Sequence, residues 1–346
     1  MKALVYDGPG QRRWTDVPDP QIQQPTDAII QVDATTICGT DLHILGGDVP
    51  EVEAGRVLGH EAVGTVVSVG AAVSAVRPGD RVLASCISAC GRCLYCRTGS
   101  YGQCLSGGGW TLGHRIDGVQ AEFARIPFAD MSTHLLPEQV TDEAAVLLAD
   151  ILPTAYEVGV RNGRVQPSET VVIVGAGPIG LAAVLTARLF SPSHIVVIDP
   201  AERRLQAAKQ LGADVTVTPA GDPAEVVRAI TDGLGADVVM EAVGTPATFE
   251  TCMSLVRPGG RVANIGVHGK PATLHLEEQW ARNITITTGL VDTYTTPMLL
   301  RLLASHQLAV TDLITHRYAM ADAMAAYDTF ADAAATGALK VLLTRG

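Results

Sequence analysis

The chain has 346 residues, of which 47% are hydrophobic and 18% charged, and its formal net charge is −11. This length suits two domains of ordinary size with a substantial core. No run of Lys and Arg is present, which argues against nucleic acid and anionic membranes as partners, because both require clustered positive charge. The N-terminal MKALVYDGPG lacks the apolar core of a signal peptide, and no stretch of about 18 apolar residues could span a bilayer. We expect a cytoplasmic protein.

The N-terminal part of the chain has the sequence pattern of a compact, partly barrel-like β domain. Short apolar runs at 28–37 and 62–70 are interrupted by Gly and Pro, as in RPGDRV at 77–82. Such broken runs are typical of short strands joined by tight turns. The pattern predicts a β-rich domain over residues 1–152.

Residues 38–43 read CGTDLH, and GHE follows at 59–61. A catalytic zinc takes three protein ligands and leaves the fourth position to water or substrate, so Cys38 and His60 are suitable ligands that need a third. Thr40 could hand a proton outward, and His43 could pass it to solvent. Taken alone, His43 would be interpreted as an ordinary surface histidine, and only the complete set favours a proton path.

Two carboxylates accompany this set. Asp41 and Glu61 are candidates to orient or tune the metal ligands, and Glu61 could also serve as an alternate ligand. The plainer interpretation of the whole stretch is a strand end followed by a turn that polar residues cap.

Five of the seven cysteines are crowded into one short stretch. An odd number of cysteines is poor evidence for a disulfide framework in a reducing compartment. Four of them follow the spacing Cys-x2-Cys-x2-Cys-x7-Cys, which supplies the complete tetrahedral shell of a structural zinc. These four are Cys90, Cys93, Cys96 and Cys104. Free buried thiols are the alternative, and Cys86 lies outside the set, where we expect a strand residue.

The apolar segment AAVLLADILPTAYEVGV carries Asp150 alone among hydrophobic neighbours, shortly before Pro153. A buried carboxylate without a partner is costly. Asp150 is therefore predicted as the third ligand of the catalytic zinc, since a Cys/His/Asp set is chemically reasonable for this metal. The alternative is an N-cap for a helix that begins near Pro153.

Strands and helices alternate from residue 169 onward. Apolar runs predict strands at 170–177, 194–200, 213–217, 236–244 and 260–267. The pattern predicts an amphipathic helix at 178–190 and a second helix at 201–212. Buried parallel strands separated by helices imply a doubly wound sheet. The pattern stops near residue 295, so 153–294 is predicted as a second domain, and 295–346 is expected to rejoin the first.

The hexapeptide GAGPIG follows a strand and opens a helix. Its glycines allow a tight turn and bring backbone N–H groups close to a pyrophosphate at the helix N-terminus. The predicted nucleotide contacts in this turn are Gly175, Gly177, Pro178, Ile179 and Gly180. Asp199 ends the next strand, nineteen residues after the last glycine, where an acid accepts the hydroxyls of the adenosine ribose. We therefore expect NAD in preference to NADP.

Two further positions belong to the same edge of the predicted sheet. Arg204 could pack over the adenine or the ribose, or lie on a solvated helix face. Val243, in the strand end EAVG, and the later strand end NIGV lie where a dinucleotide would bind.

These motifs resemble those of the zinc-dependent, medium-chain alcohol dehydrogenase family across essentially the whole chain. The resemblance rests on GHEAVGTVVSVG followed by VRPGDRV and on the complete cysteine set. The segment GWTLGHRIDGVQAEF and the aspartate at the third ligand position resemble the bacterial secondary-alcohol dehydrogenases. Some members of this aspartate-type branch lack the cysteine set and use NADP, whereas this chain keeps the set.

The resemblance implies an α/β chain. A β-rich GroES-like catalytic domain would comprise 1–152 and 295–346, and a doubly wound parallel-sheet Rossmann domain would comprise 153–294. The resemblance also assigns the catalytic zinc to Cys38, His60 and Asp150.

Other roles come from the same resemblance. It assigns the proton relay to Thr40 and His43 and places Trp110 in the substrate pocket. Thr154 and Lys340 would contact the cofactor. Related bacterial enzymes suggest a homo-oligomer, either a tetramer or a dimer.

We therefore expect an NAD-dependent alcohol dehydrogenase with two zinc ions per chain, which interconverts small alcohols, secondary ones foremost, with ketones or aldehydes. A threonine or polyol dehydrogenase would share the CGTDLHI-like sequence, although the apolar surroundings of Asp150 and the presence of Trp110 favour a hydrophobic substrate. A zinc-free enone or quinone reductase is disfavoured by the intact ligand set. A non-enzymatic nucleotide-binding protein is disfavoured by Thr40 and His43.

Overall fold

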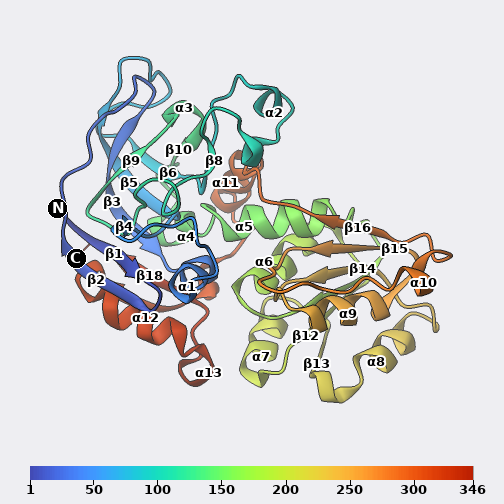
Figure 1. Cartoon of the computed structure of the whole chain (residues 1–346). Helices are drawn as coiled ribbons and strands as arrows, with labels where there is room; N and C mark the ends of the chain where they lie inside the picture. Colours follow the sequence, from blue (N-terminus) through green and yellow to red (C-terminus); the bar gives the residue numbers. More distant parts are fainter. Residues whose placement is uncertain (346) are drawn as a thin grey trace. The chain divides into compact units, whose positions relative to one another are not determined.

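The computed structural model describes residues 1–345, and the chain folds as two units (Figure 1). Unit 1 comprises residues 1–153 and the C-terminal segment that begins at Val291, and unit 2 comprises Thr154–Leu290. The borders expected from the sequence stood at 152 and 295. Within the described residues, no helix is both long and apolar enough to cross a membrane.

Unit 1 is built on a mixed sheet whose strands come from both ends of the chain. The strand order is β10-β6-β5-β3-β18-β17, and β9 pairs with β3 beside this path. The strands are β3 (Ala28–Thr36), β5 (Ala62–Val69), β6 (Arg81–Ala84), β9 (Phe123–Ile126), β10 (Thr133–Leu135), β17 (Ile314–Ala319) and β18 (Lys340–Thr344). The β-branched residues of β3 and β5 favour extended backbone, and most of their side chains are buried. The two sequence runs that predicted these strands are thus strands in the structure.

Smaller elements complete unit 1. One small sheet contains β1 (Lys2–Gly8), β2 (Gln11–Asp16) and β4 (Arg56–Val57), and another contains β7 (Ile87–Ser88) and β8 (Gly109–Trp110). The α-helices are α1 (Gly39–Gly46), α2 (Leu94–Arg97), α3 (Ala129–Ser132), α4 (Asp142–Val146), α11 (Thr296–Ala304), α12 (Ala323–Ala331) and α13 (Ala333–Thr336). Figure 1 shows α12 beside β2 and β18. The prediction of Cys86 as a strand residue is wrong, because the chain bends there between β6 and β7 and the Cys86 N–H donates to Ala149 O at 3.1 Å.

Unit 2 contains a six-stranded sheet in the order β13-β12-β11-β14-β15-β16, and every neighbouring pair is parallel. The strands are β11 (Thr170–Val174), β12 (His194–Ile198), β13 (Val215–Val217), β14 (Ala236–Glu241), β15 (Val256–Asn264) and β16 (Thr285–Thr288). The order reverses between β11 and β14, which is the position where doubly wound sheets bind dinucleotides at the carboxyl ends of their strands.

Helices connect these strands. They are α6 (Pro178–Ala187), α7 (Glu202–Gln210), α8 (Pro223–Ile230), α9 (Pro246–Leu255) and α10 (Leu276–Gln279). The amphipathic pattern predicted for 178–190 is wrong: the α-helix ends at Ala187, and its side chains are buried on nearly all sides. The physical reason is that α6 packs against β11 and also against the π-helix η2 (Ala155–Arg161). This π-helix follows the short helix α5 (Ile151–Thr154), which spans the border between the units.

Candidate metal and nucleotide sites

Four side chains of unit 1 form a cluster with metal-ligand character. Cys38, His60, Glu61 and Asp150 each bring one ligand atom to within 4.8 Å of the others. Asp150 Oδ2 lies 3.4 Å from His60 Nε2 and 3.7 Å from Cys38 Sγ. Cys38, His60 and Glu61 are buried, and the Asp150 side chain is 13% exposed. A sulfur, a nitrogen and an oxygen donor in one small buried space suit zinc.

Local backbone structure places these ligands. Cys38 is the N-cap of α1, and Asp150 immediately precedes α5. His60 lies in the short link between β4 and β5. There the chain needs Gly59, whose φ is +92°, and a Cβ at Gly118 would overlap the carbonyl oxygens of Leu58 and Gly59. Glycine at these positions therefore lets the segment after β8 pass directly against the His60 link.

Asp41 lies behind the cluster and is fully buried. Its Oδ2 accepts hydrogen bonds from the Cys38 N–H at 3.0 Å and from Gln120 Nε2 at 3.1 Å. The hydroxyl of Tyr327 donates in turn to Gln120 Oε1 at 2.8 Å. Asp41 Oδ1 lies 3.9 Å from His60 Nδ1. Asp41 thus fixes the backbone of Cys38, one of the expected ligands. It also faces Nδ1 of His60, as a carboxylate that supports a metal-bound histidine does.

The protonation of His60 responds to the same neighbours. Burial of the ring lowers the His60 pKa, but hydrogen bonds with Asp150 and Cys38 outweigh that effect, so the pKa lies well above its ordinary value. A metal ion requires the neutral imidazole. A proton and a metal ion would therefore compete for the His60 ring.

Glu61 is fully buried, and Lys340 is 1% exposed. Glu61 Oε2 accepts from the Lys340 ammonium and from the Thr36 hydroxyl, and Lys340 Nζ also donates to Ile37 O at 3.1 Å. Burial lowers the Lys340 pKa, but the Glu61 carboxylate outweighs this effect, so the pKa is raised. Glu61 Oε1 has no hydrogen-bond partner in residues 1–345. An orphaned buried oxygen beside three ligand atoms fits a cation at this position. The contact of Lys340 with a cofactor stays a prediction.

Thr40 and His43 lie on the same short helix, α1. Thr40 Oγ1 is 3.7 Å from Cys38 Sγ, so it borders the cluster. His43 Nδ1 lies 2.9 Å from Asp48 Oδ2, and the His43 side chain is 38% exposed. Thr40 thus lies beside the metal-ligand cluster, and His43 lies at the protein surface.

Trp110 lies at the end of β8, and its ring approaches that of His60 edge-on at 6.3 Å between centroids. The His114 ring stacks on Trp110 at 4.2 Å. His114 Nδ1 lies 3.1 Å from the backbone oxygen of Trp110, and because a carbonyl only accepts, this nitrogen carries the proton. Trp110 Nε1 and His114 Nε2 are buried and unpartnered among the described residues. The stack therefore contains one unpaired donor and one unpaired acceptor, both enclosed by the protein.

The four cysteines of the predicted structural site converge around α2. Their ligand atoms lie within 4.8 Å of one another. Burial raises the Cys90 pKa, but hydrogen bonds from Ser106 and from the backbone of Arg92 and Cys93 outweigh it, so the pKa falls to about 6. The thiolate is the form that binds metal. Residues 90–104, which carry the four cysteines, are called the cysteine lobe below. A Cβ on Gly108 would overlap the Ser88 carbonyl oxygen and crowd the Cys104 sulfur, so glycine is required where the chain leaves this lobe.

The glycine turn of unit 2 has the expected geometry at the end of β11. Gly175 has a φ of +105°, and a Cβ at Gly180 would overlap its carbonyl oxygen, whereas a Cβ at Gly177 would meet open space. Pro178 and Ile179 open α6. Gly180 therefore serves close packing of the helix on the strand, and Gly177 leaves the turn accessible to a ligand.

Asp199 lies just after β12 and is 4% exposed. Its two carboxylate oxygens accept from the Ala176 N–H and the Ala201 N–H, both at 2.8 Å. Arg204 Nη1 lies 4.0 Å from Asp199 Oδ2, with the arginine side chain 33% exposed. The carboxylate is thus held beside the glycine turn, and the arginine is near it.

Some structural residues of this edge were not singled out from the sequence. Glu241, at the end of β14, accepts hydrogen bonds from the N–H groups of Val243 and Gly244, at 3.0 and 2.9 Å, and so shapes the turn next to the glycine loop. Val243, which the sequence did single out, is 46% exposed in that turn. Thr154 ends α5. A carboxylate at the carboxyl end of a buried strand was the available signal for Glu241. No spacing rule could have revealed Gln120, whose partners lie far away in the sequence.

Comparisons with known proteins agree with this geometry. The family described as "Alcohol dehydrogenase GroES-like domain" matches residues 24–138, and "Zinc-binding dehydrogenase" matches residues 178–305. An alcohol dehydrogenase from Cupriavidus necator is 36% identical over 363 aligned residues, which cover 99% of this chain and 98% of that protein.

Two solved structures extend the comparison. Zinc-dependent alcohol dehydrogenase 2 from Streptococcus pneumonia is 46% identical with a TM-score of 0.95, and the match covers 100% of this chain and 98% of that one. An alcohol dehydrogenase from Thermus sp. ATN1 is 36% identical with a TM-score of 0.92 and full coverage of both chains (100% each). The chain belongs to the zinc-dependent medium-chain alcohol dehydrogenase family.

Proposed function

We propose that this protein is a zinc-dependent dehydrogenase that uses NAD to oxidise small alcohols, secondary alcohols foremost, and reduces the matching ketones or aldehydes. The observation that carries the proposal is the buried cluster of Cys38, His60 and Asp150, backed by Asp41 and Glu61. The first three residues would hold the metal. A zinc ion at this position would polarise the substrate oxygen as a Lewis acid.

The chain's own residues supply a route for the hydroxyl proton. Thr40 borders the cluster and can accept a proton from the substrate while it donates its own outward. His43 donates from Nδ1 to Asp48, because a carboxylate only accepts, and so its Nε2 is the nitrogen that takes up a proton. The exposed His43 can then release this proton to solvent.

The nucleotide site supports NAD. Backbone N–H groups at the start of α6 can bind a pyrophosphate, and Asp199 can accept from the ribose hydroxyls. The same carboxylate would repel the 2′-phosphate of NADP, although Arg204 at 4.0 Å softens the repulsion. We expect a preference for NAD of at least about tenfold in kcat/KM, which requires about 1.4 kcal/mol.

The cysteine lobe supports a second, structural zinc. Cys90, Cys93, Cys96 and Cys104 would fill the tetrahedral shell of a zinc ion without help from water or substrate. Gly102 in the lobe donates its N–H to Asp292 at 2.8 Å. A metal bound by the four cysteines would hold the cysteine lobe in the position in which Gly102 can donate to Asp292.

A second candidate function is the oxidation of diols or other alcohols with an additional polar group. Trp110 Nε1 and His114 Nε2 offer a donor and an acceptor without partners in the described chain. Both atoms are enclosed, and a small rotation of the rings would let a second polar group of a substrate pair with them. An apolar secondary alcohol would leave both unpaired.

One experiment tests these proposals together. Metal analysis of the purified protein is combined with NADH and NADPH formation from matched alcohols, such as 2-butanol and 2,3-butanediol. Turnover of 2-butanol with NAD and two zinc ions per chain would support the main proposal. A strong preference for the diol would favour the second candidate, and no alcohol-dependent reduction of either nucleotide would refute both.

A further inference from the structure

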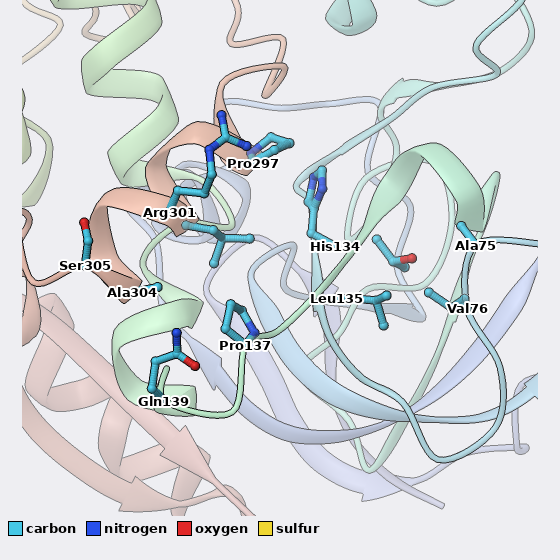
Figure 2. Close-up of a pocket in the computed structure, with 12 residues that line it drawn as sticks. Ala75, Val76, His134, Leu135, Pro137, Gln139, Pro297, Arg301, Ala304 and Ser305 are labelled. Carbon is cyan, nitrogen blue, oxygen red and sulfur yellow. The ribbon is translucent and has the colours of Figure 1, made fainter.

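A series of buried hydrogen bonds connects helix α12 with the expected ligands Cys38 and His60. Tyr327, on α12, is 0% exposed, and Gln120 is 1% exposed. The Tyr327 hydroxyl lies 2.8 Å from Gln120 Oε1, and Gln120 Nε2 lies 3.1 Å from Asp41 Oδ2. None of these three side chains lines the cavity of about 580 Å³ that β10 and α11 border in unit 1 (Figure 2). Side chains enclosed in this way can act only through the groups that they contact.

The direction of each hydrogen bond in the series follows from the chemistry of the partners. Gln120 Nε2 also lies 3.2 Å from the carbonyl oxygen of Thr36, and a carbonyl or a carboxylate only accepts. The amide nitrogen of Gln120 therefore faces Asp41 and Thr36, and its amide oxygen faces Tyr327. The Tyr327 hydroxyl must then donate to that oxygen. Because all members are satisfied in one arrangement only, the series is rigid.

The two carboxylate oxygens of Asp41 have different surroundings. Oδ2 accepts from Gln120 and from the Cys38 N–H at 3.0 Å. Oδ1 is buried without a hydrogen-bond partner among residues 1–345, and it lies 3.9 Å from His60 Nδ1. When a metal holds His60 Nε2, the proton of the neutral ring is on Nδ1, and Asp41 Oδ1 is the acceptor that faces it. The unpaired oxygen therefore fits a metal-bound His60.

Gln120 also packs on the backbone that carries His60. A Cβ at Gly59 would lie 2.5 Å from Gln120 Cγ, so the Gln120 side chain lies directly against the residue that precedes His60. On the other side of the series, the Arg12 guanidinium lies 5.1 Å from the centre of the Tyr327 ring. Gln120 is thus held between α12 and the His60 link.

We propose that Gln120 and Tyr327 are positioning residues that determine the metal affinity of the catalytic cluster. Gln120 fixes the plane of the Asp41 carboxylate by donating to Oδ2, which leaves Oδ1 for His60. Tyr327 fixes the Gln120 amide in the orientation that can donate to Asp41. Because Tyr327 belongs to α12, full metal affinity requires that this C-terminal helix is docked. The inference rests on the proposed function, since that function places a metal ion at the cluster.

The zinc affinity of the cluster tests this proposal. Zinc-loaded protein is dialysed against a graded series of chelator concentrations, and the retained zinc is measured. Asp150→Ala identifies which of the two ions belongs to the cluster. Gln120→Met keeps the side-chain length but lacks the amide, and zinc binding at the cluster should weaken at least about tenfold, as is typical when a residue that supports a metal ligand is lost. The four cysteines should retain their zinc as they do in the parent.

Two tyrosine variants separate a positioning role from a purely structural one. Tyr327→Phe removes the hydroxyl that donates to Gln120, and zinc binding at the cluster should weaken about fivefold. Tyr318→Phe is the matched control, because it removes a hydroxyl that lies 2.7 Å from the hydroxyl of Thr329, which is also on α12. The control should bind zinc as the parent does. Equal zinc affinity in Tyr327→Phe, Tyr318→Phe and the parent would overturn the proposal, whatever the two variants lose in unfolding temperature.

Cobalt substitution gives a second readout that does not depend on alcohol turnover. The visible absorption of bound Co²⁺ reports the geometry of its ligands, and the contribution that Asp150→Ala loses belongs to the cluster. We expect this contribution to change in Gln120→Met and to stay unchanged in Tyr318→Phe. A parent protein that binds no metal at the cluster would refute the proposed function and this inference together. A parent that binds metal there, with affinity and spectrum unaltered in Gln120→Met and Tyr327→Phe, would refute this inference alone.

Discussion

The ion pair of Lys340 and Glu61 leads to a prediction about stability at the residue scale. The side chains are 1% and 0% exposed. Lys340→Met leaves the Glu61 carboxylate buried without its cation and should lower the free energy of unfolding by about 3–5 kcal/mol. Chemical denaturation measures this loss. The double variant Lys340→Met/Glu61→Gln should recover part of it, because the buried charge is then gone. A loss below about 1 kcal/mol in the single variant would contradict the prediction.

His134 predicts a pH dependence of stability. Its folded pKa of about 4 lies below the ordinary value of 6.5, so the unfolded chain binds more protons between these two pH values. The stabilisation is therefore complete above pH 6.5 and is lost as the pH falls towards 4. At pH 5 the loss should be about 2 kcal/mol. His134→Leu should lose less stability than the parent between pH 7 and pH 5 in denaturation experiments. An equal loss in both proteins would contradict this prediction.

Asp150 is the residue on which the catalytic metal assignment depends most. Asp150→Ala removes the oxygen that lies 3.4 Å from His60 Nε2. We expect zinc content to fall by one ion per chain and alcohol turnover to be abolished, as measured by metal analysis and NADH formation. Asp142→Ala, which removes another carboxylate of unit 1, is the control. Near-normal turnover in Asp150→Ala, with its zinc content unchanged, would show that Asp150 has a structural role.

Residue types and short spacings were enough to point to most residues of this candidate site. The CGTDLH and GHE motifs identified Cys38 and His60, and the isolation of Asp150 in an apolar segment suggested the third ligand. The structure brings these three side chains together. No short-range pattern could reveal that Gln120 and Tyr327 support Asp41, because a hydrogen bond across 207 residues depends on the finished fold. The same holds for the Trp110–His114 stack, whose geometry depends on how the loop after β8 turns.

At the scale of elements, the strand–turn–helix unit of β11 and α6 predicts opposite outcomes for two glycines. Gly180→Ala forces a Cβ against the Gly175 carbonyl oxygen and should cost at least about 1–3 kcal/mol of stability. Gly177→Ala meets open space and should keep its stability. Its affinity for NADH should nevertheless fall, because the new methyl group occupies the approach to the pyrophosphate. Denaturation and fluorescence titration with NADH separate the two effects. Equal stability of the two variants would contradict this account.

Element prediction was most successful where a strand is apolar and continuous. The runs at 170–177 and 194–200 are the strands β11 and β12. The strand β16 was missed, because its TITT sequence is largely polar and only partly buried, as an edge strand can be. The apolar character of 178–187 reflects burial on several sides of α6, which a single amphipathic face does not describe. The π-helix was also not foreseen, since one extra residue in a helical turn has no simple sequence signature.

At the scale of the whole molecule, two metal sites of different kinds predict a zinc content of two per chain. Cys93→Ser should lower this content by one ion and lower the unfolding temperature, because a structural metal contributes folding energy. Any folded enzyme that remains should still turn over alcohol. Cys252→Ala, which removes a cysteine outside both clusters, should keep both ions. Full stability and full zinc content in Cys93→Ser would refute the structural site.

The position of β18 in the sheet of unit 1 has a consequence for synthesis on the ribosome. This strand, Lys340–Thr344, lies between β3 and β17 and carries the lysine that neutralises Glu61. The nascent chain therefore leaves residues Ala34–Thr36 of β3 without their partner strand until β18 has been translated, whereas unit 2 is continuous in sequence and can fold earlier. An unpaired strand edge favours aggregation, because its free N–H and C=O groups can pair with another chain. We expect the interval between translation of β3 and of β18 to be the period in which the chain depends most on chaperones.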